Sequence, residues 1–267
     1  MSYIQLLLLG AIAGFTIFLG LPLAFWKAAG RRTRAFLNAF SAGILTFLLL
    51  EVAHKVIDNV ETRLPGMCVP RGGVPCYPRG SWSLYLTVAL LGFGIVLVTL
   101  VWFQQRFMRI RAAAEGGERP SHLALMIAMG IGLHNFSEGL AIGESWVSGS
   151  LTLAVLLIIG FGVHNATEGF GIAAPLTGHQ VRPLALLGYG LVGGTPTFLG
   201  TVVGSVMSSA ILDTIFLSMA MGAILYVIGE LFHVGRRFGT PLTSAFGVIA
   251  GFFLAFATDL VLTVAGA

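Results

Sequence analysis

Long apolar segments alternate with short polar connections along the whole chain. Each apolar segment is close to the roughly 20 residues that a helix needs to cross the hydrocarbon core of a bilayer. We place these segments at Tyr3–Trp26, Ala35–Ile57, Trp82–Phe103, Leu123–Gly143, Leu151–Pro175, Leu184–Met207, Thr214–Val234 and Pro241–Val264. The pattern predicts an all-α membrane protein whose eight transmembrane helices form one polytopic domain over residues 1–267.

Composition supports this interpretation. Hydrophobic residues make up 56% of the chain and charged residues 10%, whereas a soluble domain carries about 25% charged residues. The net charge of +4 does not indicate a nucleic-acid partner, because the basic residues are spread over the connections between the apolar segments. The expected surroundings are a lipid bilayer.

The basic residues also predict the orientation of the chain. Eleven of the fifteen lysines and arginines lie in or beside the first, third, fifth and seventh connections. Cytoplasmic connections of membrane proteins carry such an excess of positive charge. The odd-numbered connections, including a short loop at about 104–122, are therefore predicted to be cytoplasmic. Both termini and a small loop at about 58–81 are then external.

Cys68 and Cys76 both lie in this external loop, in a segment rich in proline and glycine. Disulfides persist in oxidising compartments, so we predict that the two cysteines close a small loop on the outer side. A transient thiol pair that captures metal ions is the alternative.

Two short stretches in the fourth and fifth apolar segments are nearly the same. Gly130–Ile142 and Gly160–Ile172 share seven of thirteen positions, and each contains the motif His-Asn-x-x-Glu-Gly. Residues i and i+4 of a helix lie one turn apart on the same face. The histidine and the glutamate of each motif therefore point the same way.

These four side chains predict a metal site near the middle of the membrane. They are His134, Glu138, His164 and Glu168. A carboxylate in hydrocarbon costs about 3 kcal/mol unless it is paired, and a cation between the two helices would offset that cost. The set suits Zn²⁺, Fe²⁺, Mn²⁺, Co²⁺ or Cd²⁺ better than Cu⁺ or Mg²⁺. Each pair could instead be a structural hydrogen bond, but its duplication at one depth favours a metal site.

The asparagines of the two motifs, Asn135 and Asn165, have three interpretations. They could bond the histidines, supply carbonyl ligands, or hold neighbouring helices together. We keep both as candidate metal-site residues and favour a ligand or supporting role for Asn165.

A second internal similarity links the second and seventh segments. Stretches that contain Glu51 with His54 and Glu230 with His233 align without gaps. These segments run in opposite directions, as do the fourth and fifth, and inverted repeats are typical of transporters with a site near the midplane. The four residues are predicted near opposite mouths of the pathway, either as metal relays or as interfacial residues that reach water.

With His-Asn-x-x-Glu-Gly in two successive segments, the chain resembles the ZIP (Zrt-, Irt-like) family of divalent metal transporters over nearly all eight segments. The resemblance implies a 3+2+3 inverted-repeat arrangement with external termini, commonly as a homodimer in the plasma (inner) membrane. It implies inward movement of Zn²⁺ or a related ion through an elevator-like change between helix bundles. It assigns the primary metal site to the two His/Glu pairs and places Asn165 beside a second site.

Three features depart from the family pattern. Ser137 and Thr167 stand where many members have proline. Thr195 stands where some members have a glutamate that completes the second metal site, so a full two-metal centre is not expected. The third connection also lacks the histidine-rich run often seen there.

An intramembrane metal-dependent hydrolase is the alternative from another class. A zinc protease motif reads His-Glu-x-x-His, whereas asparagine follows each motif histidine here. A hydrolase also needs an open coordination position and a dedicated base. A scaffold protein would leave the duplicated polar set unexplained. The sequence therefore predicts a transporter of divalent d-block ions, with Zn²⁺ as substrate and no catalytic cofactor.

Overall fold

The computed structural model describes residues 2–64, 81–108, 120–147, 151–207, 209–238 and 240–265. Its α-helices are α1 (Tyr3–Phe15), α2 (Arg31–Glu61), α3 (Ser81–Phe103), α5 (Pro120–Val147), α6 (Leu151–Ala173), α7 (Pro183–Gly204), α8 (Ala210–Arg237) and α9 (Pro241–Ala265). Shorter 3₁₀ segments lie at Thr16–Leu19, Leu21–Phe25 and Ala174–Leu176, and a π-helical turn at Gln104–Met108. These ranges contain no strand, so the predicted all-α fold is confirmed.

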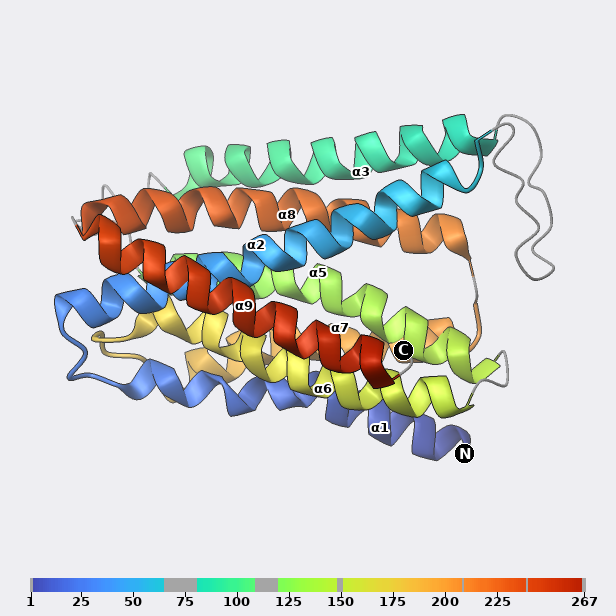
Figure 1. The fold of residues 1–267 in the computed structure, drawn as a ribbon, viewed down its shortest axis with the longest axis horizontal. Helices are drawn as coiled ribbons and strands as arrows, with labels where there is room; N and C mark the ends of the chain where they lie inside the picture. Colours follow the sequence, from blue (N-terminus) through green and yellow to red (C-terminus); the bar gives the residue numbers. More distant parts are fainter. Residues whose placement is uncertain are drawn as a thin grey trace.

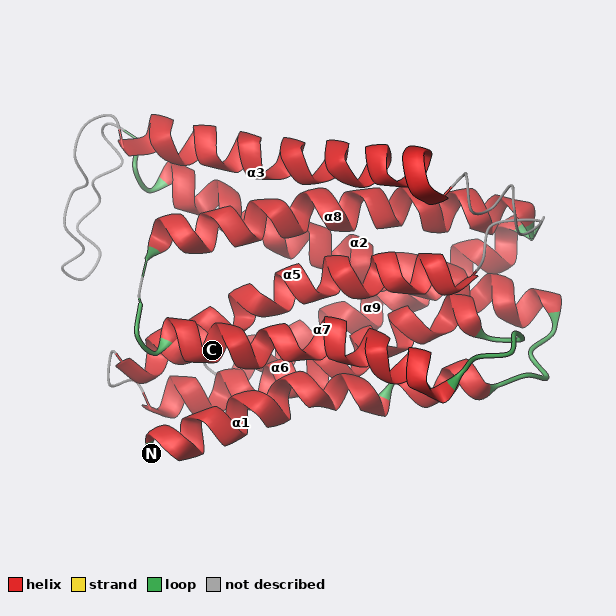
Figure 2. Ribbon diagram, turned by 180° about the vertical axis from the view of Figure 1, so that it is seen from behind, coloured by secondary structure: helices red, strands yellow, loops and turns green. Residues whose placement is uncertain are grey.

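Seven of the described helical segments are long and apolar enough to cross a membrane. They correspond to α1 with the two 3₁₀ segments that follow it, α2, α3, α5, α7, α8 and α9. The chain is therefore a multi-pass membrane protein. α6 is not among the seven, although it packs against α5 and α1 inside the bundle (Figure 2). The eighth crossing stays a prediction, as do the 3+2+3 arrangement and the external termini.

The long helices run side by side along the longest axis of the molecule (Figure 1). α3 packs on α8 and α8 on α2, while α1 packs on α6 and α7. α5 lies between these groups and contacts both α7 and α8. The start of α1 and the end of α9 lie at the same end of the bundle (Figure 1). The connections from α1 to α2, from α6 to α7 and from α8 to α9 lie at the opposite end.

Glycines let these helices approach backbone to backbone. Gly139 on α5 faces the carbonyl oxygen of Thr197 on α7, and Gly200 on α7 faces the carbonyl oxygen of Phe136 on α5. A β-carbon at either glycine would overlap that oxygen. α2 and α9 also meet through glycines. Glycines therefore bring α5 against α7 and α2 against α9.

The first predicted segment, Tyr3–Trp26, is not one continuous α-helix. α1 ends at Phe15 and tightens into 3₁₀ turns. Pro22 has no amide N–H with which to continue an α-helix, and Gly20 packs directly against the backbone of α6. The break therefore brings the first segment close to the helix that carries the second motif.

The second predicted segment is longer in the structure than the sequence indicates. Ala35–Ile57 is expected, whereas α2 runs over Arg31–Glu61, a length of 31 residues. At 1.5 Å per residue this helix is about 46 Å long, well beyond a hydrocarbon core of about 30 Å. The extra length changes the depth at which the polar residues of α2 lie.

Helical structure extends into both of the expected loops. α2 reaches Glu61 inside the loop expected at 58–81, and helical structure continues to Met108 inside the loop expected at 104–122. Cys68 and Cys76 lie outside the described residues, so their disulfide stays a prediction.

Candidate metal centre

α5 and α6 each bury one histidine and one glutamate on facing surfaces. His134 Nε2 lies 3.3 Å from Glu138 Oε1, and His164 Nε2 lies 3.8 Å from Glu168 Oε1. None of the four residues is more than 3% exposed. The pairing at positions i and i+4 that the motif predicts is therefore present on both helices.

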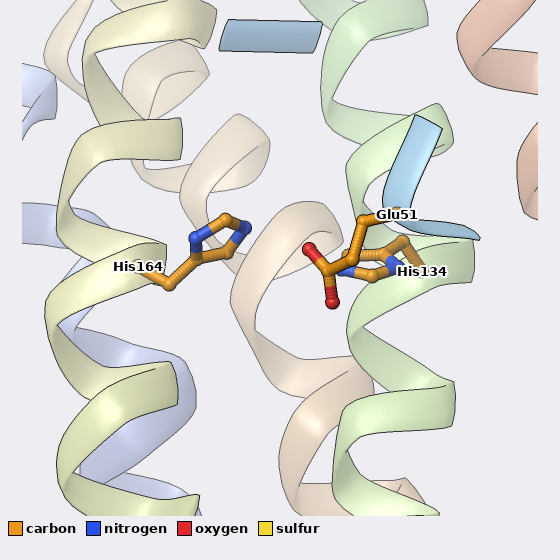
Figure 3. A group of neighbouring side chains, drawn as sticks. All are labelled: Glu51, His134 and His164. Carbon is orange, nitrogen blue, oxygen red and sulfur yellow. The ribbon is translucent and has the colours of Figure 1, made fainter. Parts of the chain in front are cut away.

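Glu51 of α2 joins the two histidines. The ring centres of His134 and His164 are 6.2 Å apart. One ligand atom from each of Glu51, His134 and His164 lies within 4.8 Å of the other two. Figure 3 shows the Glu51 carboxylate beside the ring of His134, with the ring of His164 directed toward both. Three helices thus contribute possible ligands to one buried group.

The sequence places Glu51 near the outer mouth, whereas the structure places it with the histidines. Glu51 lies about ten residues, or about 15 Å, before the end of α2. His134 and His164 lie about thirteen residues, or about 20 Å, from the ends of α5 and α6 at the same end of the bundle (Figure 1). The extension of α2 beyond Ile57 therefore puts Glu51 near the depth of the two rings.

Several polar atoms of this centre are buried without a hydrogen-bond partner in the described part of the chain. They are Nδ1 of His134, Nε2 of His164 and Oε2 of Glu138. A buried polar atom without a partner costs about 1–3 kcal/mol. A cation bound among the imidazoles and carboxylates would offset that cost, so the donor set fits a divalent metal ion.

Two further side chains contact the group and were not singled out from the sequence. Lys55 Nζ lies 2.6 Å from Oε1 of Glu51, one turn further along α2. Thr258 of α9 lies with its Oγ1 3.5 Å from Nδ1 of His164. The spacing of Lys55 from Glu51 is a usable sequence signal for an ion pair. The contact of Thr258 joins distant helices and has no local pattern.

Asn135 and Asn165 link four helices beside the histidines. Asn135 Nδ2 donates to Oδ1 of Asn165 at 2.6 Å and to the carbonyl oxygen of Gly193 on α7 at 3.0 Å. Asn165 Nδ2 donates to the carbonyl oxygen of Ala13 on α1 at 3.1 Å. Of the three interpretations, this geometry fits the joining of helices. A ligand role for either asparagine stays a prediction.

The other predicted relays lie apart from this group. His54 and His233 are exposed, and Glu230 is partly buried. Among the described residues, none of the three belongs to the cluster that Glu51 forms with the histidines. Their role as relays stays a prediction.

The fold and this centre define a multi-pass helical membrane protein with a buried histidine–carboxylate cluster between its helices. The family model described as ZIP zinc transporter matches residues 111–259, more than half of the chain. The chain belongs to the ZIP family. The matched range includes both motifs but not Glu51 or Lys55.

Two curated relatives match nearly the whole chain. The zinc transporter ZupT of Streptococcus mutans serotype c (strain ATCC 700610 / UA159) is 28% identical, over 92% of this chain and 93% of its own. The zinc transporter ZupT of Enterobacter sp. (strain 638) is 27% identical, over 92% of both chains. The family and these relatives are transporters, so the hydrolase alternative is not favoured.

Proposed function

We propose that the protein carries divalent d-block metal ions across the membrane into the cytoplasm, with Zn²⁺ as the favoured substrate. The observation that carries this proposal is the convergence of Glu51, His134 and His164 from three helices in one cluster, whose two histidines are buried. Membership of the ZIP family supports the same class of substrate.

The ligand set offers more donors than one ion needs. His134 and His164 supply two nitrogens, while Glu51, Glu138 and Glu168 supply three carboxylates. Zn²⁺ in proteins usually takes four ligands. We propose that the histidines and Glu51 hold the ion, and that Glu138 and Glu168 complete its coordination and neutralise its charge.

The remaining polar residues are proposed to act around this centre. Asn135 and Asn165 hold α5 and α6 in register with α1 and α7. His54 lies one turn beyond Glu51, and Glu230 with His233 lies in the last two turns or so of α8. In this proposal they pass the ion to and from the centre at opposite ends of the pathway.

The proposed setting is the plasma (inner) membrane, with external termini and a homodimeric assembly. The start of α2, with Arg31, Arg32 and Arg34, and the end of α8, with Arg236, lie at one end of the bundle (Figure 1), which supports this orientation. Light scattering of the purified protein, corrected for detergent, tests the dimer.

Uptake into liposomes tests the function. Purified protein is reconstituted with a metal-sensitive dye inside, and Zn²⁺, Fe²⁺, Mn²⁺, Co²⁺ and Cd²⁺ are added in turn outside. We expect rapid uptake of Zn²⁺ and its loss in His134→Ala/His164→Ala. His122→Ala, at the start of the same α5, is the matched control and should keep the wild-type rate.

Two results would contradict the proposal in different ways. Wild-type protein that moves none of the five ions would eliminate the transport function. Wild-type rates in His134→Ala/His164→Ala would keep transport but eliminate this site.

A further inference from the structure

Lys55 places its ammonium group at the edge of the metal centre. Its Nζ lies 2.6 Å from Oε1 of Glu51, the carboxylate that faces both histidines. This contact is an ion pair between neighbours at positions i and i+4 of α2. One of the three groups in the cluster is thus already neutralised by a residue of the same helix.

The side chain of Lys55 points toward the centre rather than away from it. Lysines in membrane helices usually extend toward the nearer interface, where water surrounds the ammonium. Side chains of an α-helix lean toward its N-terminus, and for Lys55 this direction leads to Glu51. The ion pair with Glu51 holds the ammonium in that orientation.

Exposure falls step by step from Lys55 to the histidines. The side chain of Lys55 is 43% exposed and that of Glu51 16%, whereas those of His134 and His164 are at most 2% exposed. In this inference, a metal ion that approaches the buried rings along α2 from its C-terminal end passes Lys55 first and Glu51 next. A metal ion that takes this route meets the ammonium before it meets its ligands.

From this geometry we propose that Lys55 is a built-in competitor for the metal site. In the empty site its ammonium neutralises Glu51, and a divalent ion must displace it from that carboxylate in order to bind. The proposal rests on the transport function proposed above, because it assumes that Glu51 is a ligand. In this proposal Lys55, which lies outside both His-Asn-x-x-Glu-Gly motifs, sets the affinity and selectivity of the site for metal ions.

The displaced ammonium has another anionic group to approach. Asp213, near the start of α8, contacts Asn59, which lies one turn beyond Lys55 on α2. The same carboxylate accepts a hydrogen bond from Nδ2 of Asn59 at 3.4 Å. In this proposal the displaced ammonium turns toward Asp213.

Displacement has two consequences for transport. A monovalent ion offers Glu51 no more charge than Lys55 already does, so the exchange favours divalent ions over Na⁺ or K⁺. The returning ammonium also competes with the bound metal, which weakens its affinity and promotes release. A carrier needs such release in every cycle.

Zinc titration of the purified protein tests the competition. Lys55→Met keeps the length of the side chain and removes its charge, so we expect at least a tenfold lower Kd for Zn²⁺ than in wild type. Lys55→Arg keeps the charge and should stay within about threefold of wild type. Lys27→Met, at the other lysine of the chain, is the matched control and should leave the Kd unchanged.

A double-variant comparison tests whether the effect acts through Glu51. In the Glu51→Gln background, Lys55→Met should no longer tighten zinc binding, because the shared carboxylate is gone. Persistence of the full tightening in that background would overturn the proposed exchange at Glu51.

The displacement itself can be observed on Lys55. The chain has two lysines, Lys27 and Lys55, so reductive ¹³C-methylation gives two assignable side-chain signals beside that of the N-terminus. We expect saturating Zn²⁺ to shift the Lys55 signal and leave that of Lys27 in place. An unchanged Lys55 signal in zinc-saturated protein would overturn the proposal.

The outcomes separate this inference from the function on which it rests. Wild-type protein without zinc binding would remove the proposed metal site and the competition with it. If wild type binds zinc and Lys55→Met binds it equally well or more weakly, the proposed metal site stands. That result would show that Lys55 supports Glu51 as a ligand, and the proposed competition would be wrong.

Discussion

Thr258 favours the tautomer of His164 that leaves Nε2 free for a metal ion. Its hydroxyl donates to the carbonyl oxygen of Ala255 at 2.8 Å, so its oxygen remains an acceptor for Nδ1 of His164 at 3.5 Å. A proton on Nδ1 leaves Nε2 with a bare lone pair. Nε2 is also the ring atom without a hydrogen-bond partner among the described residues. Partners of this kind orient metal-binding histidines.

Replacement of this hydroxyl should weaken metal binding without disturbing the fold. Thr258→Val keeps the shape of the side chain and removes the acceptor, so we expect about a tenfold higher Kd for Zn²⁺ by calorimetric titration. Thr87→Val is the control, because the Thr87 hydroxyl also donates within its own helix, to the carbonyl oxygen of Ser83 at 2.8 Å on α3. Equal affinity in Thr258→Val and wild type would show that the ring of His164 is oriented by other contacts.

Part of the candidate site could be predicted at this scale and part could not. The pairing of His134 with Glu138 follows from the helical repeat alone, since both residues lie on one helix. The position of Glu51 depends on the length of α2 and on how this helix packs against α5 and α6. Thr258 reaches His164 from a helix about ninety residues further along the chain. Contacts between distant helices leave no periodic signal in the sequence.

At the scale of helices, close packing of α5 on α7 holds the first motif in place. Gly139 lies within the motif of α5, and its α-carbon faces the backbone of α7. Gly200 on α7 likewise faces the backbone of α5, at the carbonyl oxygen of Phe136. The amide of Asn135 adds a hydrogen bond to the carbonyl oxygen of Gly193. α5 and α7 therefore meet backbone to backbone at these glycines, directly beside the first motif.

A methyl group on either side of this contact should destabilise the protein. In Gly200→Ala the new β-carbon meets the carbonyl oxygen of Phe136, so the helices must separate. We expect a loss of about 1–3 kcal/mol, the usual cost of overpacking, and a lower unfolding temperature in detergent. Gly188→Ala on the same helix is the control, because its β-carbon meets no atom within 4 Å among the described residues.

The result also separates packing from helix propensity. Alanine favours a helix over glycine by about 1 kcal/mol at both positions, so propensity alone would stabilise both variants. A Gly200→Ala protein as stable as Gly188→Ala would contradict the close contact between α5 and α7.

The helices themselves were largely predictable, whereas their ends were not. Apolar length alone predicts that α3 and α9 exist, because few polar residues interrupt them. α2 extends beyond its apolar part at both ends, where Arg31 and Glu61 are exposed. The first segment breaks because Gly20 packs on α6 and Pro22 lacks an amide donor. Proline is visible in the sequence, but the partner of Gly20 is not.

At the scale of the whole molecule, arginines at the start of α2 tie one end of the bundle together. Arg31 Nε donates to the carbonyl oxygen of Phe238, at the end of α8, at 2.8 Å. Arg34 contacts Nε2 of His179 in the connection between α6 and α7. These contacts join three parts of the chain at the end that the basic residues predict to be cytoplasmic.

The contact between Arg34 and His179 should make stability depend on pH. Burial lowers the pKa of His179 below its ordinary value of 6.5, and the positive charge of Arg34 lowers it further. Above pH 6.5 the ring is neutral in the folded and unfolded chains, and Nε2 can accept a hydrogen bond from Arg34. Below pH 6.5 the unfolded chain binds the proton more readily. The contribution to stability is therefore present above pH 6.5 and is lost as the pH falls through the lower pKa of the folded state.

Thermal unfolding of the purified protein at pH 7.5 and pH 5 tests this dependence. We expect the unfolding temperature of wild type to fall more between these values than that of His179→Gln, because glutamine keeps an acceptor for Arg34 and binds no proton. Arg34→Gln removes the repulsion between the guanidinium and a protonated His179 but leaves His179 as buried as before. The fall in its unfolding temperature should therefore lie between those of wild type and His179→Gln. Carboxylates elsewhere titrate equally in all three proteins and cancel in the comparison. The same fall in wild type and in His179→Gln would show that protonation of this histidine does not loosen the end of the bundle.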